Sequence, residues 1–112
     1  LVRSAAAKAV GRLPRAGSAE LLALCLADEP VSMVRVSLAQ SLLRLGEADE
    51  FALRLVDQRV SSESHDVARL AMAGYLADHL DVYPASRPTL VDLRDHDPSR
   101  SVRVLLLEKI GI

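Results

Sequence analysis

The sequence predicts an all-α fold, a single domain of antiparallel helix pairs stacked into an α-α superhelix. Three observations lead there: one apolar pattern recurs along the chain, Pro and Gly separate its occurrences, and Leu, Val and Ala dominate the apolar residues. Trp is absent, and only one Phe and two Tyr occur. Ala and Leu are the best helix formers, and small or unbranched side chains allow helices to pack closely. We therefore expect an aliphatic core between helices.

The recurring pattern is a Val that opens a helix, followed by mainly apolar residues three, four and eight positions later. It begins at Val2, Val34, Val67 and Val102, so that successive occurrences follow at nearly equal intervals. Positions with these offsets fall on one side of an α-helix. The pattern predicts four amphipathic helices, each burying one stripe.

A second helix is predicted ahead of each of the last three. Leu22, Leu55 and Leu90 each precede the following opening Val by the same interval, within short stretches rich in Leu and Val. Ser18 and Ser86 are candidate N-caps for two of these helices, because a Ser hydroxyl can accept a free N–H of the first turn. Together with the Val-led helices, this gives about seven helices.

Turn residues divide the chain at matching places. Pro30 and Pro98 both lie four residues before the Val of their pair, and Gly46 is placed to end the helix that Val34 opens. The chain therefore divides into three and a half repeats. The half repeat is 1–13, and the whole repeats are 14–46, 47–79 and 80–112.

The turns and the helices that follow them resemble HEAT repeats. Residues 28–35, Asp-Glu-Pro-Val-Ser-Met-Val-Arg, and residues 95–103, Asp-His-Asp-Pro-Ser-Arg-Ser-Val-Arg, are similar to the turn inside a repeat of the compact bacterial, phycobilin-lyase-like subtype. Residues 2–11 are similar to the second helix of such a repeat. The resemblance spans the chain and implies a HEAT-type solenoid, in which each helix pair buries the face of its neighbour.

The resemblance also implies a hydrogen-bonded ladder along the stack. In such repeats the ladder is formed by the acid in the turn and an Arg six residues later. Glu29 with Arg35, and Asp97 with Arg103, have this spacing. We expect these four residues to have a structural role.

The repeat at 47–79 departs from the ladder pattern. When Val67 is aligned with the other opening Val residues, Ser62 stands where the acid is expected and Ala68 where the Arg is expected. We therefore expect a broken rung at this repeat, covered by Asp66 or Arg69 instead.

No constellation in the sequence favours catalysis or metal binding. His65 and His96 both precede an Asp, but they lie two and six residues before their Val, so they do not superpose along the stack. Cys25 lies between Leu residues, where a small apolar role is expected. The sequence has no Gly-x-Ser-x-Gly motif and no Gly-rich phosphate loop. We expect no enzyme activity, no metal and no cofactor.

The charge balance disfavours a nucleic-acid module. The chain has 14 Lys and Arg residues and 15 Asp and Glu residues, whereas modules of that class are usually basic. No apolar run approaches the ~20 residues that span a bilayer. A single Cys fits a reducing compartment, and we therefore expect a cytoplasmic protein.

Binding of another protein is the predicted function, and the Val-led helices are expected to carry it. Residues two, six and ten positions after each Val are predicted to face outward, as columns of mixed polarity typical of an interface. Arg12 and Arg44 are candidates to anchor a carboxylate of the partner, although solvated cations at helix ends explain them equally well. The predicted partner-binding residues are Lys8, Arg12, Val36, Gln40, Arg44 and Arg69.

The chain begins and ends with a Val-led helix, and the last one carries an apolar run at 104–107. Because natural solenoid ends carry a polar capping repeat, we expect flanking repeats of the same longer chain, with end-to-end self-association as the alternative. Two other functions remain open. One is a lyase or chaperone-lyase-like module, implied by the resemblance alone, and the other is weak nucleic-acid binding, which requires the Arg residues to gather on one face.

Overall fold

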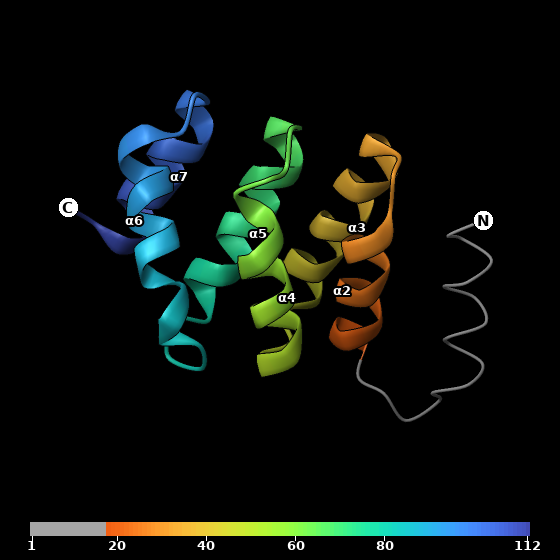
Figure 1. Ribbon diagram of the computed structural model, residues 1–112. Coiled ribbons are helices and arrows are strands. Elements are labelled where there is room, and N and C mark those ends of the chain that lie inside the picture. The colour runs from red at the N-terminus through yellow and green to blue at the C-terminus, as the bar shows by residue number, and fades with distance from the viewer. Residues whose placement is uncertain (1–17) are drawn as a thin grey trace.

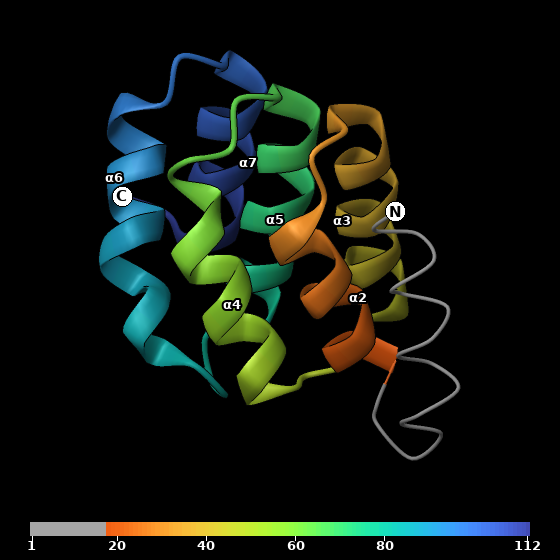
Figure 2. The ribbon, with the colours of Figure 1, turned by 45° about the vertical axis from the view of Figure 1, so that its right-hand side comes forward.

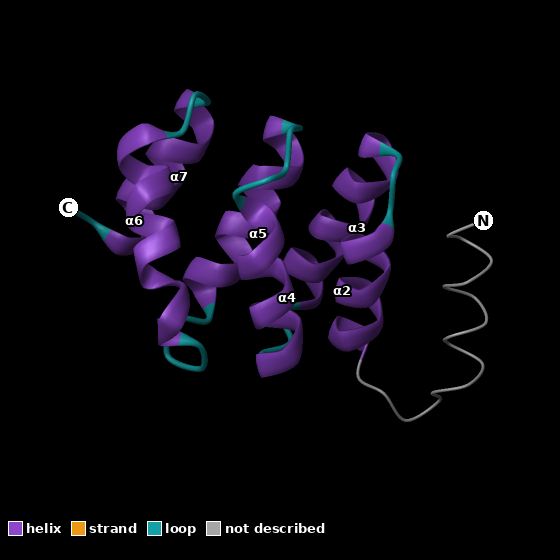
Figure 3. Cartoon of the chain, viewed as in Figure 1, coloured by secondary structure: helices purple, strands orange, loops and turns teal. Residues whose placement is uncertain are grey.

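The computed structural model describes residues 18–112, and in this range the chain forms α-helices and no β-strand (Figures 1 and 3). The prediction of an all-α fold is confirmed for these residues. A short 3-10 turn, η1 (Pro84–Ser86), leads into α6. The six helices are α2 (Ser18–Asp28), α3 (Ser32–Leu45), α4 (Glu50–Val60), α5 (Asp66–Asp78), α6 (Arg87–His96) and α7 (Arg100–Ile110).

Consecutive helices form three hairpins, α2–α3, α4–α5 and α6–α7, and the two members of each hairpin contact each other. The second helices of the hairpins form one row, because α5 contacts both α3 and α7 (Figure 2). On the other side of this row, α2 contacts α4. The hairpins thus lie side by side. The turns inside the hairpins gather at one edge, at the top of Figure 1, and the connections between hairpins lie at the opposite edge.

Local signals explain several helix ends. Gly46 ends α3 in the left-handed conformation, with φ of 64°, and its N–H donates to the carbonyl of Leu42 at 3.2 Å; glycine adopts this conformation without steric cost. Asp49 caps α4, since its Oδ1 accepts the N–H of Ala52 at 2.9 Å. Ser86 precedes α6 as predicted but caps no N–H, because its hydroxyl donates to the carbonyl of Tyr83 at 3.1 Å.

The core between the two layers is aliphatic. Among residues 18–112, Tyr75 is the one aromatic side chain that is fully buried, and it lies with Leu, Val, Ala and Met side chains. Gly74 lies at the centre of the row of second helices. A Cβ at this position would lie 3.2 Å from Leu43 Cδ1 of α3 and 3.6 Å from Leu105 Cδ2 of α7. The absent side chain therefore allows α3 and α7 to approach α5 closely.

The helical register of α5, in the predicted repeat 47–79, differs by one residue from the register that the sequence pattern predicted. Val67 was expected to open the buried stripe of its helix, but its side chain is 38% exposed. Ala68 is fully buried instead, as Val102 is in α7. The buried residues at the start of α5 and α7 are therefore Ala68 and Val102, and their interval is one residue shorter than the interval from Val67 to Val102 that the sequence pattern predicted.

None of the helices within residues 18–112 has the length and hydropathy needed to cross a membrane. The longest of them, α3, has 14 residues.

Candidate functional site

The turn inside each hairpin carries a carboxylate that is hydrogen-bonded to its own backbone. Each carboxylate accepts the N–H of the residue two positions later at 2.9 Å, and all three acidic residues are at most 5% exposed. A carboxylate in this position closes the turn and satisfies an N–H at the start of the next helix. The three pairs are Glu29 with Val31, Glu63 with His65, and Asp97 with Ser99.

An arginine six residues after each acid holds the same turn from the helix side. Its Nη1 donates to the backbone carbonyl of the acidic residue, at 3.1 Å in the first hairpin and 3.0 Å in the second. In these two hairpins Nη1 also reaches the next carbonyl, at 2.9 and 3.1 Å. The three arginine–carbonyl pairs are Arg35 with Glu29, Arg69 with Glu63, and Arg103 with Asp97.

Two of these arginines, Arg35 and Arg69, also join neighbouring hairpins. Arg35 donates from Nε to Glu63 Oε1 at 2.7 Å and from Nη2 to Oε2 at 3.1 Å. Arg69 repeats this with Asp97, at 2.9 and 3.1 Å. Both pairs are bidentate and span 28 residues. Bidentate arginine–carboxylate pairs fix geometry as well as charge. We call this row of residues the ladder: Glu29, Arg35, Glu63, Arg69, Asp97 and Arg103.

Two predictions about the ladder are corrected by this geometry. The predicted repeat 47–79 has no broken rung, because Glu63 and Arg69 fill the positions assigned to Ser62 and Ala68. The alignment on Val67 shifted that repeat by one residue. Arg69 was also predicted to face a partner, but it is only 8% exposed and is held by Asp97.

A signal for the correct register was present in the sequence. The acids at 29, 63 and 97 are evenly spaced along the chain, and the arginines at 35, 69 and 103 repeat the same interval. Charged residues that are buried in pairs must keep their spacing strictly, since a lost partner costs several kcal/mol. An opening Val can be replaced by Ala at lower cost. The charged pattern was therefore the better guide to the register.

Electrostatics agree with a structural role for the rung between Arg35 and Glu63. Burial of Glu63 favours its neutral form, but the hydrogen bonds from Arg35 and from the backbone N–H of His65 outweigh burial and lower the pKa of Glu63. The carboxylate therefore remains ionised and engaged by its donors. This arrangement leaves it poorly placed to exchange protons with a substrate.

The remaining predicted binding residues lie in different surroundings. Arg44 is exposed, and its Nη2 donates to Ser41 Oγ at 3.3 Å. Gln40 is half-buried on the same helix. Val36 was predicted to face outward, but it is buried, with 6% of its surface exposed. Lys8 and Arg12 lie outside the residues that the structure describes.

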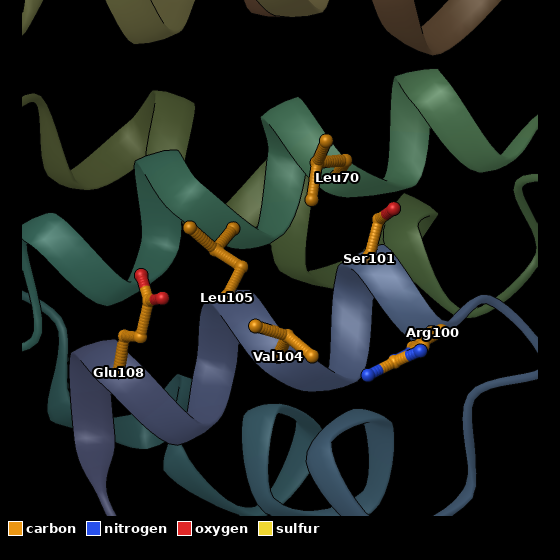
Figure 4. Close-up of a pocket in the computed structure, with 6 residues that line it drawn as sticks. All are labelled: Leu70, Arg100, Ser101, Val104, Leu105 and Glu108. Atoms are coloured by element: carbon orange, nitrogen blue, oxygen red, sulfur yellow. The ribbon is translucent and has the colours of Figure 1, made fainter.

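A shallow, open groove of about 480 Å³ lies between α5 and α7 (Figure 4). Leu70 lines it from α5, and Val104 and Leu105 face it from α7. Arg100 and Glu108 stand toward opposite ends of the α7 side, so that one cation and one anion flank an apolar centre. The groove is completed by Ser101.

Exposed apolar side chains continue this surface along the row of second helices. Met33 is 62% exposed near the start of α3, and Val67 is 38% exposed near the start of α5. Both occupy the position that Ser101 holds in α7, since each lies two residues before the ladder arginine of its own helix. We call the groove together with Met33 and Val67 the row face. The outward columns predicted from the sequence lie on these helices but do not include Met33 or Val67, because they were placed at other positions.

The histidines and the cysteine have local explanations. His65 caps α5, where its Nδ1 accepts the N–H of Val67 at 3.2 Å. His96 Nδ1 lies 3.2 Å from Asp92 on the surface of α6. Burial, with the charges of Glu29 and Asp28, raises the pKa of the Cys25 thiol and so disfavours the reactive thiolate. Within residues 18–112, no three His, Cys, Asp or Glu side chains are grouped so that they could hold a metal ion.

Comparisons of this chain with protein-family models, with curated proteins and with solved structures give no match.

Proposed function

We propose that this chain is a protein-interaction module, a segment of a HEAT-type solenoid that binds another protein on its row face. The observation that carries the proposal is the open groove between α5 and α7, which has an apolar centre and opposite charges beside it. Such a mixture is typical of protein interfaces, in which an apolar core is surrounded by polar residues.

The solenoid part of the proposal rests on the repetition of contacts. Three hairpins lie side by side, and the same arginine–carboxylate hydrogen bonds recur between the first and second and between the second and third hairpin. A helix pair in a repeat protein cannot bury both of its faces alone, and contacts with its neighbours supply the missing burial. The resemblance of the turns to HEAT repeats points to the same architecture.

The shape of the groove favours a peptide segment or a helix of a partner over a small substrate. Small-molecule sites enclose most of their ligand, whereas this groove is open to solvent along α7. A lyase-like enzyme would need acid or base groups converging on one point. Here Arg100 and Glu108 stand apart, and Leu70, Val104 and Leu105 occupy the space between them.

Nucleic-acid binding finds less support on this face. A phosphate backbone is bound by gathered basic side chains. Arg35 and Arg69 are instead used by ladder carboxylates, and Arg94 donates to Asp95 and to the carbonyl of Gly111. These arginines hold the fold together and are not free to meet phosphates.

The test is affinity capture of a partner from a lysate of the source organism, with three variants beside the wild type. Met33→Glu and Val104→Glu place a charge on the row face, and both side chains are exposed, so the fold should be retained. Val82→Glu is the matched control, because Val82 is 39% exposed outside this face. We expect both row-face variants to lower recovery of the partner at least about tenfold, a loss of about 1.4 kcal/mol in binding.

Equal recovery of the same partner by all variants would show that binding occurs elsewhere on the molecule. Arg44→Glu extends the test to the far end of α3. A loss of recovery in this variant would support the predicted anchoring role of Arg44.

A further inference from the structure

The side of α7 that faces away from α5 lacks the cover that the same side of α3 and α5 has. Ala39 of α3 and Ala73 of α5 are fully buried, and each lies in a helix that the second helix of the next hairpin contacts. Leu107 occupies the corresponding position in α7, four residues after the ladder arginine as in the other two helices, and is 46% exposed. An exposed Leu at a position that is otherwise fully covered indicates a contact surface.

Arg103 also differs from the other two ladder arginines, because only some of its guanidinium donors are hydrogen-bonded. Its Nη1 holds the carbonyl of Asp97, as in the other two hairpins. In Arg35 and Arg69, Nε and Nη2 then bind the carboxylate of the next hairpin. In Arg103 these two donors have no hydrogen-bond partner among residues 18–112, and Nη1 holds the guanidinium at the turn with its donor edge available.

The unused donors and the exposed Leu lie on one side of one helix. Arg103, Leu107 and Ile110 are separated by four and three residues, which places them in a line along α7. Their counterparts in α5 are Arg69 and Ala73 with Leu76, and all three are at most 8% exposed. We call Arg103, Leu107 and Ile110 the end face.

We propose that the end face binds a helical hairpin that carries a Glu or Asp in its turn, so that this carboxylate accepts Nε and Nη2 of Arg103. The contacts of α5 with the α6–α7 hairpin show the required geometry, since Arg69 and Asp97 meet in this way. The end face continues that interface by one more step. This second surface is separate from the row face, and its failure would leave the proposed function of the row face untouched.

The charge and shape of the end face restrict the occupant. A wholly apolar helix would cover Leu107 but would desolvate the guanidinium of Arg103 without an acceptor, which is costly. The bound hairpin must therefore bring a carboxylate. Leu107 is larger than Ala39 and Ala73, and so the hairpin should present a small residue opposite it.

The test extends the full chain by a hairpin of known sequence. A second copy of residues 79–112 is joined directly after Ile112. The copied Asp97 then follows Arg103 by 28 residues, the spacing of the two existing rungs. Amide hydrogen exchange of α7 is compared between the natural and the extended chain, and we expect exchange in α7 to slow by roughly tenfold or more.

Variants of the extended chain separate the rung from nonspecific cover. Arg103→Gln and Asp97→Asn in the copied hairpin should each remove most of the added protection, and the two changes together should do little more than one alone. Arg100→Gln is the matched control on α7, because Arg100 lies on the groove side, and it should leave the protection intact. Circular dichroism of the natural chain with Arg103→Gln checks that this substitution does not unfold α7.

The proposal would be overturned by an extended chain in which α7 exchanges as fast as in the natural chain, or in which Arg103→Gln changes nothing. Self-association of the natural chain, seen as a concentration-dependent mass in analytical ultracentrifugation and abolished by Arg103→Gln, would support it. The bound hairpin would then be the first hairpin of a second copy, which carries Glu29 in its turn.

Discussion

Helices α5 and α7 are the second helices of successive hairpins, but α5 lies between α3 and α7 in the row of second helices, whereas among residues 18–112 the one second helix packed beside α7 is α5. In α5 every residue from 71 to 76 is buried. In α7 the corresponding stretch, 105–110, has Leu106 as its one fully buried residue. The two helices therefore share a register and a turn but differ in the surfaces that they bury.

The side chains of the two helices match these surroundings. Ala73 and Gly74 of α5 correspond to Leu107 and Glu108 of α7. A helix that is packed on two sides requires small residues where its neighbours approach. A helix with one free side can carry large or charged residues there. Residue size at these positions is therefore consistent with how closely each helix is packed by its neighbours.

The largest expected difference between the two helices concerns their arginines. Arg69→Ala should lower the free energy of unfolding by about 3–5 kcal/mol, because it leaves the buried carboxylate of Asp97 without its partner. Arg103→Ala removes a contact to one carbonyl and should cost at most about 1 kcal/mol. Urea unfolding followed by circular dichroism measures both values.

Similar losses for the two arginine variants would break the comparison between α5 and α7. The double substitution Arg69→Ala with Asp97→Ala serves as the control. It should be less harmful than Arg69→Ala alone, since no buried charge is left unpaired.

The next largest difference should come from filling the small positions. Gly74→Leu forces a side chain against Leu43 and Leu105, and we expect a loss of about 1–3 kcal/mol from overpacking. Glu108→Leu makes the corresponding change in α7, where Glu108 is exposed and lines the open groove, and it should alter stability by less than about 0.5 kcal/mol. Thermal unfolding of both variants decides the point, and a tolerated Gly74→Leu would show that α3 and α7 can move apart.

How far the sequence predicts this molecule differs between the fold and the surfaces. The all-α class followed from periodicity, since mainly apolar stripes such as those beginning at Val34 and Val102 have a clear helical spacing. The register failed at Val67 because a small residue, Ala68, performs the buried role there. A single apolar position tolerates such an exchange, whereas a buried charged pair does not.

The surfaces were less predictable because exposure depends on neighbours that are distant in sequence. Val36 and Arg69 each looked outward-facing in their own helix, and both are covered by other parts of the chain. The even spacing of the acids and arginines indicates the register, but it does not say that Arg35 pairs with Glu63 of the next hairpin. That pairing depends on how the hairpins pack against each other. Met33 was likewise absent from the predicted outward columns, although its side chain is 62% exposed.

A smaller effect is expected from Tyr75, which sits in α5 where α7 has Lys109. Its hydroxyl donates to the carbonyl of Glu47 at 2.8 Å and ties α5 to the connection before α4. Tyr75→Phe should cost about 1 kcal/mol, the typical contribution of one such hydrogen bond. Burial, with the charges of Asp49 and Glu47, raises the pKa of Tyr75 to about 12.

Alkaline titration provides a second measurement on Tyr75. Because its pKa in the folded protein exceeds its ordinary value of 10.0, its contribution to stability is present below that value and is lost as the pH rises toward 12. The ultraviolet absorbance of its phenolate should appear late in the titration and be absent in Tyr75→Phe. A phenolate signal from Tyr75 at its ordinary pKa would show that α5 is not closed around this side chain.

The smallest expected effect is the loss of stability at acid pH that comes from the rung between Arg35 of α3 and Glu63, in the turn before α5. The pKa of Glu63 in the folded protein lies below its ordinary value of 4.5, although burial offsets part of the effect of Arg35 and the backbone N–H of His65. The contribution of Glu63 to stability is therefore present above its ordinary pKa and is lost as the pH falls through the lowered one. Glu63→Gln removes this titrating group, and so urea unfolding across the acid range should show a shallower loss of stability than in the wild type. The corresponding donors of Arg103 meet no carboxylate within residues 18–112, and Arg103→Gln should leave the acid profile unchanged. Equal profiles for Glu63→Gln and the wild type would mean that this rung holds its geometry without favouring the ionised carboxylate.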